Sequence, residues 1–251
     1  MEMFTSELIS SLIGLVIGFV FKYLIDKVKE AIRNKPINLF FRSPKSKLLI
    51  IHSAIFDKDR NAYDYPACDT KAARLIASRL TKIGLNEGKD FRVVADADLL
   101  KDKSNYERML KENDLIVLCS PKRNYITKMV LENLNNLRYQ PVYDEQKKLN
   151  YIKDRLNNVD LISSEDKSER HFNLECIDYG LLISAPNPFN VSKRVVIISG
   201  NHGEGTLGVA EYIQSDENVK KLLSREEQKK IEELIVVKYC EPEIISTKIM
   251  A

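Results

Sequence analysis

A glycine-rich segment, Gly200–Gly208, has the residue types best suited to bind a ligand. It reads GNHGEGTLG and directly follows the apolar run Arg194–Ser199. Glycines let backbone N–H groups approach an anion closely, and the N-terminus of a following helix favours negative charge. The segment has neither the Gly-Lys-Ser/Thr ending of a P-loop nor the spacing of the dinucleotide fingerprint, which disfavours NTP hydrolysis and NAD chemistry. We expect this segment to contact a phosphate or nucleotide through Gly200, Asn201, His202, Gly203, Gly205 and Thr206. The alternative is a tight turn that binds no ligand.

Two further strand ends carry polar side chains. Ser120 and Asn124 stand between an apolar strand and a helix, and Ser53 ends the first strand. In open α/β sheets, ligands bind beyond the carboxyl ends of the strands, near the point where the strand order reverses. We therefore expect Ser53, Ser120 and Asn124 to complete the same ligand site. The long loop from Ala54 to Asp69 is a candidate lid, in which Asp57, Tyr63 and Tyr65 could cover a base or ribose. The alternative is that this loop is a packing surface.

No catalytic set is recognisable around the three histidines. His52, His171 and His202 have neither an HExxH pattern nor a CxxC pair nearby. His202 is the one candidate, as a donor to phosphate, whereas His52 lies in an apolar strand and is expected to be a satisfied core residue. We predict no catalytic residue, no metal site and no cofactor. Asp178–Gly180 and Pro186–Asn190 have the composition of turns.

Strands alternate with helices over most of residues 47–251, which predicts an α/β fold with a Rossmann-like, mostly parallel sheet. The expected strands are 47–53, 91–95, 114–119, 194–199 and 234–239. The expected helices are 69–84, 106–111, 125–137, 206–213 and 224–233. Residues 139–184 instead show short apolar runs with polar turns, among them an expected short strand at Tyr179–Ile183, which indicates an antiparallel insertion or sheet edge.

The N-terminus is an apolar helix of a length that can reach across a bilayer. The charge-free stretch Leu8–Phe21 is too short by itself, but residues 3–25 extend about 34 Å as a helix, against a bilayer core of roughly 30 Å. A single transmembrane span then places Glu7 and Lys22 near the two interfaces. A cleaved signal peptide, which would want positive charge before the apolar run, and a buried or interfacial helix are the alternatives.

The distribution of charge orients this span. The first 47 residues hold eight Lys/Arg and four Asp/Glu, which gives this segment a net charge of +4. Because the whole chain has a net charge of +3, residues 48–251 have a net charge close to −1. All eight cations follow the apolar segment, and the positive-inside rule therefore places the C-terminal domain in the cytoplasm of a single-pass protein of the inner (plasma) membrane. The near-neutral domain disfavours duplex nucleic acid as a partner. We divide the chain into a membrane helix with a basic collar facing lipid headgroups (1–35), a connector (36–46) and a nucleotide-sensing domain (47–251).

Small residues recur at helical spacing in the apolar segment, at Ser10, Gly14 and Gly18. Such a ridge allows close approach of helices in lipid, which predicts a homo-oligomer, with a tetramer among the candidates. Symmetry would then turn Glu7 into a ring of carboxylates at the mouth of a pore, and acidic rings attract cations. The alternatives are ordinary glycine content and a solvated glutamate at a helix start.

The combination of a short N-terminal membrane helix, a basic collar and a Rossmann-like sensor resembles membrane effectors of prokaryotic antiphage nucleotide-signalling systems. CRISPR-associated membrane proteins with a ligand-sensing CARF domain share this plan, and the channel subunit of the Hailong system is similar in overall layout. The final third of the soluble part also looks like a recurring bacterial domain with a glycine-loop nucleotide fold, through Asp178–Leu181, Pro186–Asn190 and Gly200–Thr206. None of these families has a catalytic set that matches this chain.

The resemblance and the residues together predict an oligomeric membrane effector. We expect an ion channel or membrane-disrupting protein of antiviral defence, gated by a nucleotide or short oligonucleotide on its cytosolic domain. One alternative is a membrane-anchored enzyme acting on a nucleotide or nucleoside. Another is an anchored scaffold for a partner protein.

Overall fold

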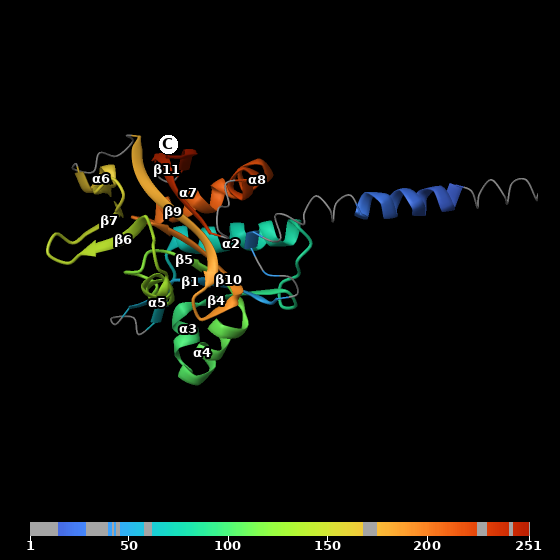
Figure 1. Cartoon of the computed structure of the whole chain (residues 1–251), viewed down its shortest axis with the longest axis horizontal. Helices are drawn as coiled ribbons and strands as arrows, with labels where there is room; N and C mark the ends of the chain where they lie inside the picture. The colour runs from blue at the N-terminus through green and yellow to red at the C-terminus, as the bar shows by residue number, and fades with distance from the viewer. Residues whose placement is uncertain are drawn as a thin grey trace, which may run out of the picture.

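The centre of the molecule is a seven-stranded sheet (Figure 1). The computed structural model describes residues 15–28, 40–41, 43, 46–57, 62–167, 175–224, 230–240 and 243–250. The strand order is β12-β11-β9-β10-β5-β1-β4. The strands are β1 (Leu48–His52), β4 (Phe91–Ala95), β5 (Asp114–Leu118), β9 (Cys176–Asn187), β10 (Asn190–Gly200), β11 (Ile231–Cys240) and β12 (Glu243–Ile249).

The sheet is mixed. Strands β4, β1, β5 and β10 are parallel neighbours, whereas β9 pairs antiparallel with both β10 and β11, and β12 pairs antiparallel with β11. Because β11 reverses the direction of β9, five of the seven strands run the same way. The predicted α/β class with a mostly parallel sheet is therefore confirmed.

Helices cover both faces of the sheet. The first face packs against α2 (Ala67–Lys82), α7 (Gly203–Tyr212) and α8 (Asp216–Ser224). The second packs against α3 (Asp96–Leu100), α4 (Lys103–Glu112) and α5 (Tyr125–Asn133). Leu48 and Ile50 belong to the first core, and Leu49 and Ile51 to the second. Successive side chains of a strand point to opposite faces, so a continuous apolar run is what a strand covered on both faces requires.

The predicted antiparallel insertion is present as a separate three-stranded sheet. It consists of β6 (Tyr139–Asp144), β7 (Leu149–Asp154) and β8 (Val159–Ile162). The short helix α6 (Ser164–Lys167) follows it, and β2 (Ile55–Asp57) with β3 (Ala62–Asp64) forms a small hairpin after β1.

Two predicted elements are wrong. Residues 231–233, expected in a helix, begin strand β11, and the nearby helix α8 ends at Ser224; residues 225–229 lie outside the described part. Ile231 and Leu234 are buried against the sheet core, so tertiary packing overrides the helix-forming glutamates between them. Asp178, given a turn composition, lies inside strand β9 and pairs with β11, and so do residues 179–183, where a short strand was also expected.

Residues 15–28 form a helix whose side chains are all exposed, among them Phe19 and Phe21. No other atom lies within 4 Å of the position that a Cβ of Gly18 would take. Within the described residues, no helix combines the length and hydropathy that a bilayer crossing requires. Glu7, Ser10 and Gly14 precede the described residues, so the expectations for them stay predictions.

Phe40 and Phe41, in the predicted connector, are fully buried in the first core, with their rings edge to face and 4.9 Å apart. Next to them, the backbone N–H and hydroxyl of Ser43 donate to the buried carboxylate of Asp114, at 2.7 and 3.0 Å. The connector is thus attached to the sheet at the amino end of β5.

Replacing Phe40 by alanine should lower the free energy of unfolding by about 3–5 kcal/mol, because it removes a fully buried ring from the core. Urea unfolding followed by circular dichroism measures the change. Val191→Ala, at a side chain that is 81% exposed, is the control and should stay within about 0.5 kcal/mol of the parent protein. Equal stabilities for the two variants would show that the connector does not contribute to the core.

Candidate functional site

A small cavity of about 140 Å³ lies at the carboxyl ends of β5 and β10. Strand β1 continues through α2 to β4 on one side, whereas β5 lies on the other side of β1, so the strand order reverses between β1 and β5. This is where open α/β sheets bind ligands. The cavity is lined by Pro66, Asp69, Cys119, Ser120, Arg123, Asn150, Gly200, Asn201, His202 and Gly203.

Five of the predicted ligand-binding residues meet in this cavity. They come from the two strand ends singled out in the sequence: Ser120, Gly200, Asn201, His202 and Gly203. Because the two segments are 80 residues apart in the chain, the topology of the sheet brings them together. Whether they bind a ligand stays a prediction.

The other four predicted residues do not line the cavity and are buried in the surrounding structure. The Ser53 hydroxyl donates to Asp69 Oδ2 at 2.5 Å. The Asn124 side chain caps helix α5 by accepting from Thr127 N–H at 3.1 Å, and its amide donates to a carbonyl at the end of β5. Gly205 and Thr206 lie in the first turn of α7.

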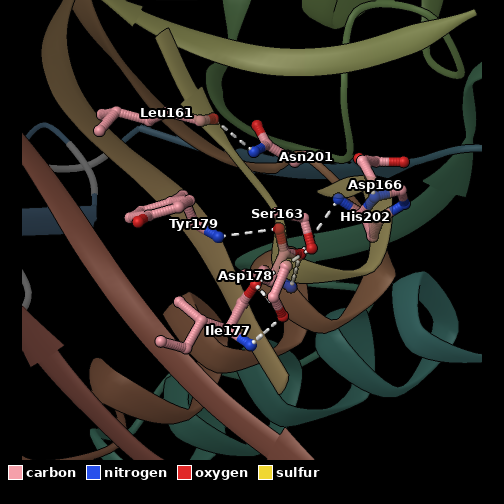
Figure 2. Close-up of polar contacts among 10 residues, drawn as sticks. Leu161, Ser163, Asp166, Ile177, Asp178, Tyr179, Asn201 and His202 are labelled. Atoms are coloured by element: carbon pink, nitrogen blue, oxygen red, sulfur yellow. Dashed lines mark hydrogen bonds and ion pairs between the residues drawn. The ribbon is translucent and has the colours of Figure 1, made fainter. Parts of the chain in front are cut away.

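The glycine-rich segment surrounds a carboxylate of the protein itself, that of Asp178 on β9 (Figure 2). The N–H groups of His202 and Gly205 both donate to Asp178 Oδ2, at 3.1 and 2.7 Å. The N–H of Tyr179 donates to Oδ1 at 2.8 Å. Two of the backbone donors expected to face a phosphate therefore already have an anionic acceptor.

The glycines are explained by this close packing. A Cβ on Gly205 would lie 2.6 Å from Asp178 Oδ2, and one on Gly200 would collide with the backbone nitrogen of Thr206. A Cβ on Gly203 would lie 2.8 Å from Cys68 Cβ, on helix α2. Any side chain at these three positions would push apart α7, β9 and α2.

Asp178 and His202 form an electrostatic pair. Asp178 is fully buried, and burial raises the pKa of its carboxyl to about 6 although His202 and the three N–H donors favour the charged form. Burial alone would lower the pKa of His202, but the charges of Asp178 and Asp166 outweigh it and raise that pKa above its ordinary value. His202 Nε2 lies 2.7 Å from Asp166 Oδ2, on the short helix α6 (Figure 2).

A larger groove of about 670 Å³ adjoins the cavity and shares Arg123 with it. Its cations are Lys122, Arg123, Lys128 and Arg155, and its acids are Asp96, Glu132 and Glu145. Lys122 Nζ lies 3.8 Å from the centre of the Tyr143 ring. Arg123 is exposed and has no ion pair among the described residues, so its charge is available to a ligand.

The predicted lid residues lie elsewhere. The Tyr65 ring is 5.8 Å from that of His52, and both line a separate hollow beside the edge strand β4. Lys101 Nζ lies 5.5 Å from the centre of the Tyr63 ring. His52 is half-buried, and its Nδ1 is 3.0 Å from the carbonyl oxygen of Ser53. The described part of the structure does not include the side chain of Asp57 or any atom of His171.

Cys119 directly follows β5 and has a backbone φ of +85°, a conformation that is strained for a residue with a side chain. Burial and the neighbouring charge of Asp69 raise the pKa of its thiol well above the ordinary value. The thiol therefore stays protonated and is a poor nucleophile. Among the described residues, no group of three His, Cys, Asp or Glu side chains is arranged to hold a metal ion.

Sequence reasoning did not assign Asp178, Asp166, Asp69 or Asn150 to the ligand site, whereas Arg123 belongs to the strand-end segment 120–127 that it singled out. The one available signal was for Asp178, a single acid three residues before the apolar run Leu181–Ile183. Comparisons of this chain with protein-family models, curated proteins and solved structures gave no match.

The Asp178–His202 pair predicts a stability that falls as pH rises. Folded Asp178 keeps its proton up to about pH 6, whereas the unfolded chain releases it near 3.8, so its contribution is lost between these values. The contribution of His202 is complete below its unfolded pKa of 6.5 and is lost as pH rises through the raised folded value. Urea unfolding from pH 4 to 8 measures both.

In the variant Asp178→Asn, the decline between about pH 4 and 6 should be smaller than in the parent protein. The control is Asp160→Asn, at an exposed residue of β8, which should keep the parent profile. Parallel profiles for parent and Asp178→Asn would contradict the assignment of a raised pKa to this carboxyl.

Proposed function

We propose that the domain is a nucleotide sensor, and that the whole chain is a membrane effector controlled by this sensor. The observation that supports the sensor is the meeting of two strand-end segments at one cavity. Arg123 lines this cavity and also the neighbouring groove, which carries cations and tyrosines. A volume of about 670 Å³ is within the range of roughly 300–1,000 Å³ of small-ligand sites.

The chemistry of the groove suits a ligand with an anionic part and a flat part. Arg123 offers a planar, permanently charged group that can bind a phosphate through two N–H donors. Tyr125, half exposed at the same groove, offers a ring face on which a base can stack. The mix of cations and acids favours a mononucleotide or short oligonucleotide over a long polyanion.

For the membrane part, helix 15–28 supplies a run of exposed apolar side chains, and the apolar segment predicted from the sequence begins at residue 3. We propose that this segment spans the inner membrane once, with the domain in the cytoplasm, and that copies of it assemble into an ion channel of antiviral defence. Gating requires that the nucleotide bind the open and closed assemblies with different affinities.

Replacing Arg123 by alanine should weaken nucleotide binding by roughly tenfold or more, because a hydrogen-bonded charged contact to phosphate is lost. The measurement is calorimetric titration of the purified protein with mononucleotides, short oligonucleotides and a 20-base-pair duplex, the last expected not to bind specifically. Arg108→Ala, at an exposed arginine on α4, is the matched control. Equal affinities for both variants would place the ligand elsewhere.

In liposomes, the full-length protein should change its ion flux when a nucleotide that binds is added. Gly18→Leu, which adds a bulky side chain to the predicted small-residue ridge, should reduce both self-association and flux. The domain's nucleotide affinity serves as the internal control, because it should be unaffected. Absence of flux under every nucleotide tested would remove the channel from the proposal.

One observation favours the alternative of a membrane-anchored enzyme. His202 at the cavity is held by Asp166 at 2.7 Å, and a histidine oriented by a carboxylate is a common general base. The two functions differ in whether the nucleotide is recovered unchanged after binding. Among the described residues, the His202 ring is hydrogen-bonded only to Asp166, so no hydroxyl or thiol is in place for it to activate, which is why we prefer the sensor.

A further inference from the structure

Two residues that line the small cavity each have a buried side-chain oxygen without a hydrogen-bond partner within the described residues. Asp69 is 2% exposed, and its Oδ2 accepts from Ser53 whereas its Oδ1 has no partner. Asn201 is 4% exposed, and its amide donates to the carbonyl of Leu161 at 2.8 Å, which leaves its Oδ1 without a partner (Figure 2). Buried polar atoms are nearly always paired, so these two acceptors call for a donor.

The polarity of the cavity argues against a phosphate inside it. The unpartnered atoms are acceptors, and one of them belongs to a carboxylate, which repels an anion. The backbone donors of His202 and Gly205 are already bonded to Asp178. The thiol of Cys119 lies beside Asp69, but a thiol is only a weak donor. The group that fits must itself carry hydroxyl or N–H donors.

The size of the cavity limits that group. A water molecule takes up about 30 Å³ of the liquid, so about 140 Å³ holds a sugar ring but not a whole nucleotide. Arg123 lines both this cavity and the groove, so a phosphate bound to it is adjacent to both.

We propose that the cavity is the ribose subsite of the nucleotide site, in which Asp69 Oδ1 and Asn201 Oδ1 accept hydrogen bonds from the 2′- and 3′-hydroxyls. This assignment rests on the proposed sensor function and makes it specific: the phosphates lie at Arg123, the base lies in the groove at Tyr125, and ligands with free ribose hydroxyls are preferred. The glycine-rich segment then shapes the wall of the sugar site and does not hold the phosphate.

The test compares sugar chemistry in the full-length protein. Calorimetric titrations use the four ribonucleoside triphosphates, their 2′,3′-dideoxy counterparts and inorganic triphosphate. The protein should bind at least one ribonucleotide more tightly than its dideoxy counterpart by roughly ten- to hundredfold, because a charged acceptor then loses its donors. Inorganic triphosphate should bind weakly, and Arg123→Ala should weaken ribo and dideoxy forms by the same factor.

The variant Asp69→Asn should reduce the preference for the ribonucleotide by roughly tenfold, since an N–H donor can replace the acceptor at Oδ1 while the other position still accepts from Ser53 and Asn201 keeps its own acceptor. Asp160→Asn is the control and should keep the preference. If the parent protein bound the ribo and dideoxy forms with equal affinity, the ribose subsite would be overturned but the proposed sensor function would not. This comparison needs no variant to fold. Absence of binding by every nucleotide would overturn the sensor, and the subsite with it.

Discussion

The buried carboxylate of Asp178 organises the carboxyl edge of the sheet. Its three N–H donors are Tyr179 on the strand that carries it and His202 and Gly205 in the glycine-rich segment. An ionised carboxylate is costly to bury unless it is fully hydrogen-bonded, so the turn must close tightly around it. The glycines at 200 and 205 permit that closure, because any Cβ there would collide with the backbone or with the carboxylate itself. The path of the chain from β10 into α7 follows from this single group.

This arrangement changes what the turn can offer to a ligand. A glycine turn before a helix usually presents free N–H groups to a phosphate. Here two of those groups are bonded internally, and the wall of the cavity is completed by oxygen acceptors from Asp69 and Asn201. The positive charge available to a ligand comes instead from Arg123, on the neighbouring strand end. The site is therefore divided into a donor side and an acceptor side.

Much of the fold could be predicted from the sequence. The central strands β1, β5 and β10 are continuous apolar runs, and burial on both faces leaves such runs few alternatives. The start of β11 was missed because its glutamates favour a helix locally, whereas the neighbouring strands decide the outcome. Asp178 was missed because Asp-Tyr-Gly has turn composition, and only its pairing with β11 reveals a strand.

The candidate site was half predictable for a similar reason. A topological rule locates strand ends, so Ser120 and the residues at 200–203 could be expected to meet. The same rule does not say which polar side chains at these strand ends are hydrogen-bonded to other groups of the protein and so cannot contact a ligand. Ser53 and Asn124 satisfy groups of the protein, and Asp69 and Arg123, which carry the most useful chemistry, come from a helix start and a turn with no recognisable motif.

The anchoring of Phe40, Phe41 and Ser43 restricts how the domain can stand relative to the N-terminal helix. Twelve peptide units separate residue 28 from Phe40, a tether of at most about 43 Å when fully stretched. Ser43 is bonded to Asp114 at the amino end of β5, whereas the small cavity lies past Leu118 at the opposite end of that strand. The chain therefore joins the domain at the edge of the sheet opposite the cavity, and a lipid surface holding the helix would lie within that tether length of Phe40.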